Sequence, residues 1–285
     1  MENRGVEMEL RWLRGFGDWT ISLGGNLTWQ KNKLIDLGNA DGWQTLQSNG
    51  TAGDIARAKN GEPFPYFYGF KTGGIFQNQS EADAYNNKYN LKSGDTFYAV
   101  PGDIIYLDSN GDGAIDYEDR TRIGKGMPDW VYGFNLGVEW KGLQLTAYFQ
   151  GVWGNKIYDA SLRGDTPAKN MPAWMLNRWT GEGTSNLIPR YVIGDPRNWM
   201  SSDIYLNDGA YCRLRNLTLS YTFPQNIIRK VGFSNFKVFV SAENLFTWTK
   251  YHGYDPEVGG GTAIGIDYGV YPQARIFNVG FNISI

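Results

Sequence analysis

Apolar and small polar residues alternate from Trp19 to Trp29, with an aromatic residue at each end of the segment. A repeat of two residues predicts a two-faced β-strand. At about 3.3 Å per residue and a tilt of about 40°, the segment places its two tryptophans roughly 25 Å apart along a membrane normal, the height of the apolar band of an outer-membrane barrel. We therefore predict a membrane-spanning strand. Its apolar face carries Trp19, Ile21, Leu23, Leu27 and Trp29.

The same alternation recurs along the chain and predicts seven strands. Their expected ranges are 6–14, 19–29, 131–140, 143–152, 211–223, 235–246 and 273–285. The connections alternate between short ones of about 4, 2 and 11 residues and long ones of about 100, 58 and 25 residues. Outer-membrane barrels have short periplasmic turns and long extracellular loops. The predicted fold is therefore all-β: the C-terminal strands, about seven, of a large antiparallel transmembrane β-barrel with long extracellular loops.

Composition changes this picture little. Aromatic residues make up 15% of the 285 residues and 37 residues are glycine, which suits aromatic girdles and tight turns. No apolar run approaches the length of a transmembrane helix. A net charge of −2 gives no electrostatic case for a nucleic-acid partner. Seven strands do not close a barrel, and residues 1–20 lack a secretory signal, so we expect residues 1–285 to be the C-terminal part of a longer barrel.

Four ordered motifs carry a resemblance to a known family. They are Tyr68–Gln77 (YGFKTGGIFQ), Gly102–Gly113 (GDIIYLDSNGDG), Asn216–Tyr221 (NLTLSY) and Glu243–Phe246 (ENLF). Together they resemble the C-terminal part of the SusC/RagA family, the TonB-dependent outer-membrane transporters of Bacteroidetes. Two positions depart from the family pattern: the chain ends in Ile285 where an aromatic residue is usual, and Cys212 replaces an aliphatic residue.

The resemblance implies a function and partners. It implies a 22-stranded barrel in the cell outer membrane, in contact with outer-membrane lipid, with a plug domain and N-terminal strands that are absent from residues 1–285. The expected activity is TonB-dependent active import of an oligosaccharide or peptide nutrient. The expected partners are a SusD-like surface lipoprotein over the extracellular mouth and the TonB complex, reached through the absent plug segment.

One motif points to a metal. Residues 108–119 match the twelve-residue calcium loop at positions 1, 3, 5 and 6 and carry a carboxylate at position 12. Calcium prefers hard oxygen ligands, so we predict a structural, weakly bound Ca²⁺ in an extracellular loop. An Asx-rich turn without a metal is the alternative. The predicted ligands are the side chains of Asp108, Asn110 and Asp112, the carbonyl of Ala114, Asp116 through water, and Asp119.

Other polar and aromatic residues leave alternatives open. Arg213 and Arg215 share the parity of Leu217, which predicts either snorkelling to lipid phosphates or, after a local bulge, a position in the lumen. Aromatic loop residues are weak candidates for stacking on a sugar, with packing as the commoner role. These residues are Trp43, Tyr66, Phe67, Trp153, Trp174, Trp179 and Trp199.

We expect no enzyme, no catalytic residue and no organic cofactor. His252 is the single histidine and has no nucleophile in a recognisable turn near it, so it is predicted to be an ordinary loop residue. The alternative function is a calcium-dependent carbohydrate-binding β-sandwich, a surface binding protein suggested by the calcium loop and the loop tryptophans. Strands of about ten residues with aromatic residues at both ends argue against it.

Overall fold

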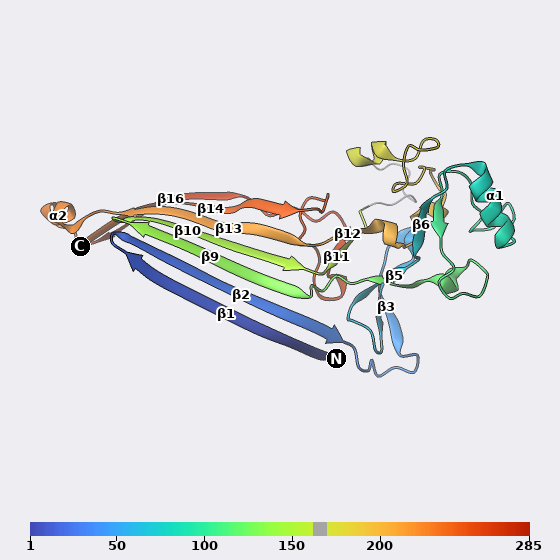
Figure 1. The fold of residues 1–285 in the computed structure, drawn as a ribbon, viewed down its shortest axis with the longest axis horizontal. Coiled ribbons are helices and arrows are strands. Elements are labelled where there is room, and N and C mark those ends of the chain that lie inside the picture. The colour runs from blue at the N-terminus through green and yellow to red at the C-terminus, as the bar shows by residue number, and fades with distance from the viewer. Residues whose placement is uncertain (162–169) are drawn as a thin grey trace.

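The computed structural model describes residues 1–161 and 170–285. Seven strands form one antiparallel sheet in the order β1-β2-β9-β10-β13-β14-β16 (Figure 1). This confirms the predicted all-β fold, and the seven long strands lie in one sheet rather than in the two facing sheets of a β-sandwich. The strands are β1 (Glu2–Phe16), β2 (Trp19–Lys33), β9 (Trp130–Trp140), β10 (Leu143–Trp153), β13 (Tyr211–Thr222), β14 (Asn235–Thr249) and β16 (Ile276–Ser284).

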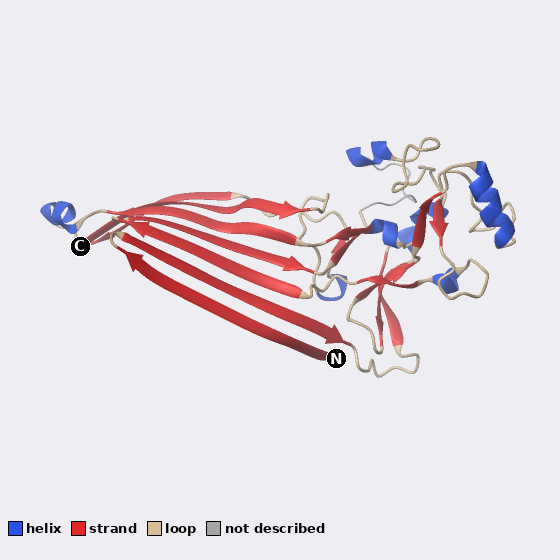
Figure 2. Ribbon diagram, in the orientation of Figure 1, coloured by secondary structure: helices blue, strands red, loops and turns tan. Residues whose placement is uncertain are grey.

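The sheet has two unlike ends. Short connections join the strands at one end, here called the turn end, where α2 (Gln225–Ile228) lies apart from the helices at the opposite end (Figure 2). The long connections 34–129, 154–210 and 250–275 all leave from the opposite end, the loop end. The alternation of turns and loops predicted from the sequence is therefore confirmed.

The long connections fold into smaller elements beyond the loop end (Figure 1). Three small sheets contain β3 (Trp43–Ser48), β4 (Asp54–Lys59), β5 (Tyr66–Gly69) and β8 (Thr121–Gly124); β6 (Thr72–Ile75) and β7 (Ile104–Tyr106); and β11 (Lys156–Asp159), β12 (Leu206–Asp208) and β15 (Ile266–Asp267). The helices there are α1 (Gln79–Lys88), η1 (Gly50–Ala52), η2 (Tyr117–Asp119), η3 (Ala173–Asn177), η4 (Arg197–Trp199), η5 (Asp203–Tyr205) and η7 (Gly261–Ala263), while η6 (Arg229–Val231) follows α2.

Strand register aligns the tryptophans into two rows on one face of the sheet. At the turn end Trp19 pairs with Trp140, and their rings stack with centroids 5.5 Å apart. At the loop end Trp29 pairs with Trp130, which in turn pairs with Trp153. Between the rows the same face carries aliphatic and phenyl side chains. Tryptophans thus stand at both borders of the apolar band, continuous across three strands at the loop end and across two at the turn end.

The apolar face of the sheet is not covered by other parts of the described chain. Leu10 on β1 and Val279 on β16 are 76% and 84% exposed. The well-packed core lies instead among the loops, where one buried cluster surrounds Ile55 and Phe67 and another surrounds Phe70 and Tyr106. A large exposed apolar face requires an apolar partner, because its contact with water is unfavourable.

Among residues 1–161 and 170–285, no helix has both the length and the apolar character needed to cross a membrane.

Candidate functional site: the loop end of the sheet

A buried ionic network joins the sheet to the connection 250–275. Arg213, near the start of β13, is 2% exposed, and its Nη2 donates to Asp255 Oδ1 at 2.6 Å. Its Nη1 donates to Glu257 Oε2 at 3.0 Å and its Nε to Thr247 Oγ1 at 2.9 Å. All three donor groups of the guanidinium are therefore used. A buried arginine is stable only when paired in this way.

A β-bulge places both arginines on the polar face of the sheet. The register of β13 against β10 and β14 shifts around Arg215, so Arg213 pairs with Gln150 in the row of polar side chains. Arg215 donates to Gln150 Oε1 and Asn244 Oδ1, both at 3.1 Å, and forms an ion pair with Glu257. The local bulge of the second predicted alternative is present, and both side chains lie on the face opposite the apolar one. The prediction that both residues snorkel to lipid is wrong, because the bulge exchanges the faces of the residues that precede Asn216 in β13.

Asp255 connects this network to the connection 250–275. Its Oδ1 accepts from Glu257 N as well as from Arg213, and its Oδ2 accepts from Gln273 N at 2.9 Å. Burial raises the pKa of the Asp255 carboxyl, but the two backbone N–H groups and Arg213 lower it more, so the net pKa lies below the ordinary value. The carboxylate stays ionised and ties both ends of the 255–273 segment together.

The sequence gives no signal for this network. Asp255 and Glu257 are two of the 29 acidic residues of the chain and belong to no motif that the sequence analysis recognised. Tyr211, whose hydroxyl donates to Glu257 Oε1 at 2.5 Å, begins a predicted strand, and nothing in the sequence singles it out. Only the register shift in β13 reveals that these groups face one another.

The predicted calcium-loop residues lie together in one tight turn. Asp108 accepts from Gly111 N at 2.6 Å and from Gly113 N at 3.0 Å, while Asn110 Oδ1 accepts from Asp112 N at 3.0 Å. Gly111 and Gly113 have φ of +79° and +84°, a region that glycine adopts without strain. The side chains at positions 1 and 3 thus accept backbone N–H groups within the same turn. Asp112 Oδ1 accepts from Ala114 N at 2.9 Å.

Asp119 and Asp116 close this turn against η2. The Asp119 side chain is 1% exposed, and it accepts from Ser109 N at 2.7 Å and from Asp116 N at 3.1 Å. Asp116 in turn accepts from Glu118 N at 2.7 Å, and the side chains of Asp116 and Asp119, each accepting from the backbone N–H of the other residue, form a capping box. Within residues 1–161 and 170–285, three or more His, Cys, Asp or Glu side chains do not converge on one metal-sized site. The donor set remains one of oxygen atoms, which is the chemistry that calcium prefers.

A cavity of about 670 Å³ opens between the loops. Its walls include the rings of Trp174, Trp199 and Tyr205 and the side chains of Asp159, Asn207 and His252. His252 lies 3.4 Å from Asp159 through Nε2, and its ring packs edge-on against Trp174 with centroids 4.8 Å apart. Aromatic surfaces beside a few polar groups are typical of small-molecule sites.

The aromatic loop residues divide between packing, the girdle and this cavity. Tyr66 and Phe67 are 3% and 1% exposed and pack in the loop core, so neither is available to a ligand. Trp153 belongs to the aromatic row at the loop end, and Trp43 lies under the guanidinium of Arg57 at 4.2 Å. Trp179 packs with the Phe70 cluster. Trp174 and Trp199 remain as cavity residues.

The chain is similar over its whole length to curated TonB-dependent receptors. TonB-dependent receptors P3 and P26 of Formosa agariphila are each 31% identical to it over 301 residues, which cover 100% of this chain and 29% of each receptor. TonB-dependent receptor SusC of Bacteroides thetaiotaomicron is 25% identical over 94% of this chain and 24% of its own length. The chain therefore spans less than a third of the length of these relatives.

Solved structures share the fold. The structure of the RagAB peptide transporter covers 99% of this chain with a TM-score of 0.74 and 22% identity, and the match covers 29% of that chain. The open-open state of the RagAB peptide importer gives a TM-score of 0.73. No family model matches the chain. The seven-stranded sheet corresponds to part of the barrel in these structures.

Proposed function

We propose, from the premise that this chain is a SusC/RagA-like TonB-dependent receptor, that it acts in TonB-dependent import of glycan or peptide nutrients across the outer membrane. The observation that carries the proposal is the sheet, whose uncovered apolar face is bordered by two rows of tryptophan. We assign residues 1–285 to the C-terminal strands of the barrel, with the turn end in the periplasm. Its relatives are receptors and transporters, which supports a transport role rather than catalysis.

The opposite face of the sheet suits the wall of an aqueous lumen. Asn135, Thr146 and Thr218 lie in the polar rows of β9, β10 and β13. A hydrated lumen accepts such side chains without the cost of burying unpaired polar groups. The cavity with Trp174 and Asn207 lies among the loops that would form the extracellular mouth, where rings and amides suit either a sugar or a peptide.

Two partners follow from the same premise. A SusD-like lipoprotein would cover the loops, and the similarity to the RagAB peptide transporter supports a two-component assembly. The TonB complex would supply energy through a plug segment outside residues 1–285.

We also propose that residues 108–119 bind Ca²⁺. The ligands would be Asp108, Asn110, Asp112, the Ala114 carbonyl, Asp116 through water, and Asp119; the oxygen-only donor set and the glycines at positions 4 and 6 of the loop support this assignment. The ion would neutralise neighbouring carboxylates and stiffen the turn. It would play no part in moving the nutrient.

The transport proposal is tested in cells that make the whole receptor. Cells with and without its gene are given labelled oligosaccharide and peptide pools, and uptake is measured with and without a protonophore that removes the energy source of TonB. We expect one pool to enter in a gene-dependent and protonophore-sensitive manner. An immunoblot with an antibody to residues 108–130 should place the receptor in the outer membrane. A soluble protein, or uptake that is independent of the gene for both pools, would contradict the proposal.

A further inference from the structure

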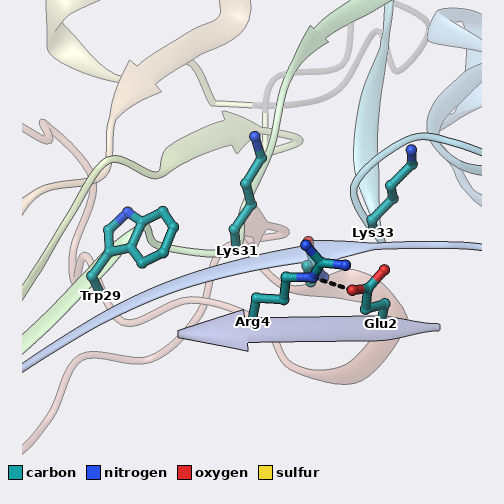
Figure 3. A pocket seen from close by; sticks show the side chains of 6 residues that line it. Glu2, Arg4, Trp29, Lys31 and Lys33 are labelled. Atoms are coloured by element: carbon teal, nitrogen blue, oxygen red, sulfur yellow. Dashed lines mark hydrogen bonds and ion pairs between the residues drawn. The ribbon is translucent and has the colours of Figure 1, made fainter. Parts of the chain in front are cut away.

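Three cationic side chains gather at the loop end of the first two strands. Arg4 on β1 pairs directly with Lys31 on β2, and the next pair along the same face is Glu2 with Lys33. Figure 3 shows these four side chains beside the ring of Trp29. They border a hollow of about 360 Å³, which Trp29 and Asn32 complete.

These cations lie on the lipid-facing side of the sheet. Trp29, Lys31 and Lys33 are separated by steps of two residues, so they leave the strand on the same face. Trp29 belongs to the aromatic row at the loop end. At about 3.3 Å per residue and a tilt of about 40°, the two lysines lie roughly 5 and 10 Å beyond that row along the membrane normal. This is the depth of lipid headgroups rather than of acyl chains.

The charge of the cluster is not balanced within the described chain. Glu2 pairs with Arg4, whose side chain is 79% exposed. Lys31 and Lys33 are exposed and make no ion pair or side-chain hydrogen bond with any residue in 1–161 or 170–285. Two positive charges therefore remain available beside an aromatic ring at the border of the membrane.

The backbone that carries the cluster is held in place. Asn32, between the two lysines, is 8% exposed, and its Nδ2 donates to the carbonyl of Phe64 at 2.5 Å. Leu34 N donates to Glu62 O at 2.8 Å. A further strand joined to the free edge of β1 would lie beside it in the sheet, since strands pair edge to edge, and would leave this face uncovered.

We propose that Arg4, Lys31 and Lys33 bind the phosphorylated headgroup of an outer-leaflet lipid, with the Trp29 ring at the top of its acyl chains. The inference rests on the proposed function, which places this sheet in the outer membrane. Ammonium and guanidinium groups bind phosphate through charge-assisted hydrogen bonds, and basic clusters beside membrane-spanning elements bind anionic headgroups. Tryptophan favours the same interfacial depth.

The test uses the whole receptor, purified in mild detergent, and counts bound lipid by native mass spectrometry. The probes are diphosphoryl lipid A, lipid A without its phosphates, and inorganic phosphate alone. We expect the receptor to retain diphosphoryl lipid A, to bind the phosphate-free lipid much more weakly, and to be little affected by inorganic phosphate at equal concentration. Removing both lysines in K31Q/K33Q should weaken lipid binding by about 30-fold, at about fivefold for each charge.

A matched control removes two exposed lysines far from the membrane. K88Q/K92Q changes Lys88 on α1 and Lys92 just after it, and should leave binding unchanged. If K31Q/K33Q does not assemble, Lys33→Gln alone should still reduce binding about fivefold. Three results would each overturn the proposal: K31Q/K33Q binds diphosphoryl lipid A as well as the wild type does, the wild type binds phosphate-free lipid A as well as diphosphoryl lipid A, or inorganic phosphate displaces the lipid completely. Fractionation of the same cells distinguishes failure of the lipid-site proposal from failure of the transport proposal. If the receptor is in the outer membrane and K31Q/K33Q binds lipid normally, only the lipid site is refuted. A soluble receptor refutes the transport proposal.

Discussion

Arg213 and Asp255 form a buried ion pair across the boundary between the sheet and its last long loop, with Nη2 and Oδ1 2.6 Å apart. Their side chains are 2% and 5% exposed. The partners are 42 residues apart in the chain, so the pair fixes a fold-level contact rather than a local turn. It holds the connection 250–275 against the polar face of the sheet, the face that the transport proposal makes the lumen wall.

Removing the arginine should release this loop. Arg213→Gln leaves Asp255 buried without its cation, and breaking a buried pair in this way costs about 3–5 kcal/mol. We expect faster deuterium uptake in peptides from residues 250–275 of the assembled receptor, measured by hydrogen-exchange mass spectrometry. Arg11→Gln is the control, because its ion pair with Glu9 is largely exposed and contributes little. Unchanged exchange in the Arg213 variant would show that the loop is held by other contacts.

Acid should loosen the same loop. The folded-state pKa of Asp255 is lowered, because the backbone N–H groups and Arg213 outweigh the opposing effect of burial. The stabilisation is therefore complete above the unfolded pKa, near 3.9, and is lost as the pH falls through the lower folded pKa. Exchange in residues 250–275, corrected for the intrinsic pH dependence of amide exchange, should be constant from neutral pH to about pH 5 and rise at lower pH. Asp255→Asn should remove this response; a response that persists in that variant would assign it to another group.

The strands could be predicted from the sequence because each has one face in an apolar medium and one in a polar medium. The apolar alternation predicts a second strand that ends at Trp29, whereas β2 continues to Lys33, because backbone pairing persists after the alternation stops. The folded elements within the loops have no regular period and were not predicted. The face on which Arg213 lies could not be predicted. One bulge in β13 moves its side chain from the apolar to the polar face, and the position of that bulge depends on how β13 pairs with β14.

Calcium should bind to the turn of residues 108–119. Asp108→Asn removes a charge at the first ligand position, where the carboxylate also accepts from Gly111 N and Gly113 N. The wild-type receptor should bind calcium with a dissociation constant of about 10⁻⁴–10⁻³ M, and the variant several-fold more weakly. Equilibrium dialysis with radioactive calcium measures this directly. Asp41→Asn, in an exposed loop, is the control with the same loss of charge. Equal binding by all three proteins would favour the Asx-rich turn without a metal.

Two loops touch through glycine at one point beyond the sheet. A Cβ added to Gly126 would overlap the carbonyl group of Ile264, and one added to Gly265 would lie 2.7 Å from Gly126 Cα. Gly265 also joins β11 to this contact, because its carbonyl accepts from Tyr158 N at 2.8 Å. The obstacle to a side chain at Gly126 is backbone, which cannot rotate away as a side chain can.

Gly126→Ala should therefore separate the two loops, at a cost of about 1–3 kcal/mol for overpacking. Amide exchange should rise at residues 258–266 and at Tyr158, whose N–H is bonded to the Gly265 carbonyl. Gly260→Ala is the control: it adds the same methyl group to the opposing loop, the one that contains Ile264, but no atom lies within 4 Å of the new Cβ and its φ of −173° suits any residue. Similar exchange in the two variants would mean that the loops shift apart at little cost. A rise confined to the Gly126 variant would show that this backbone contact holds the first and last long loops together, independently of the ionic network around Arg213.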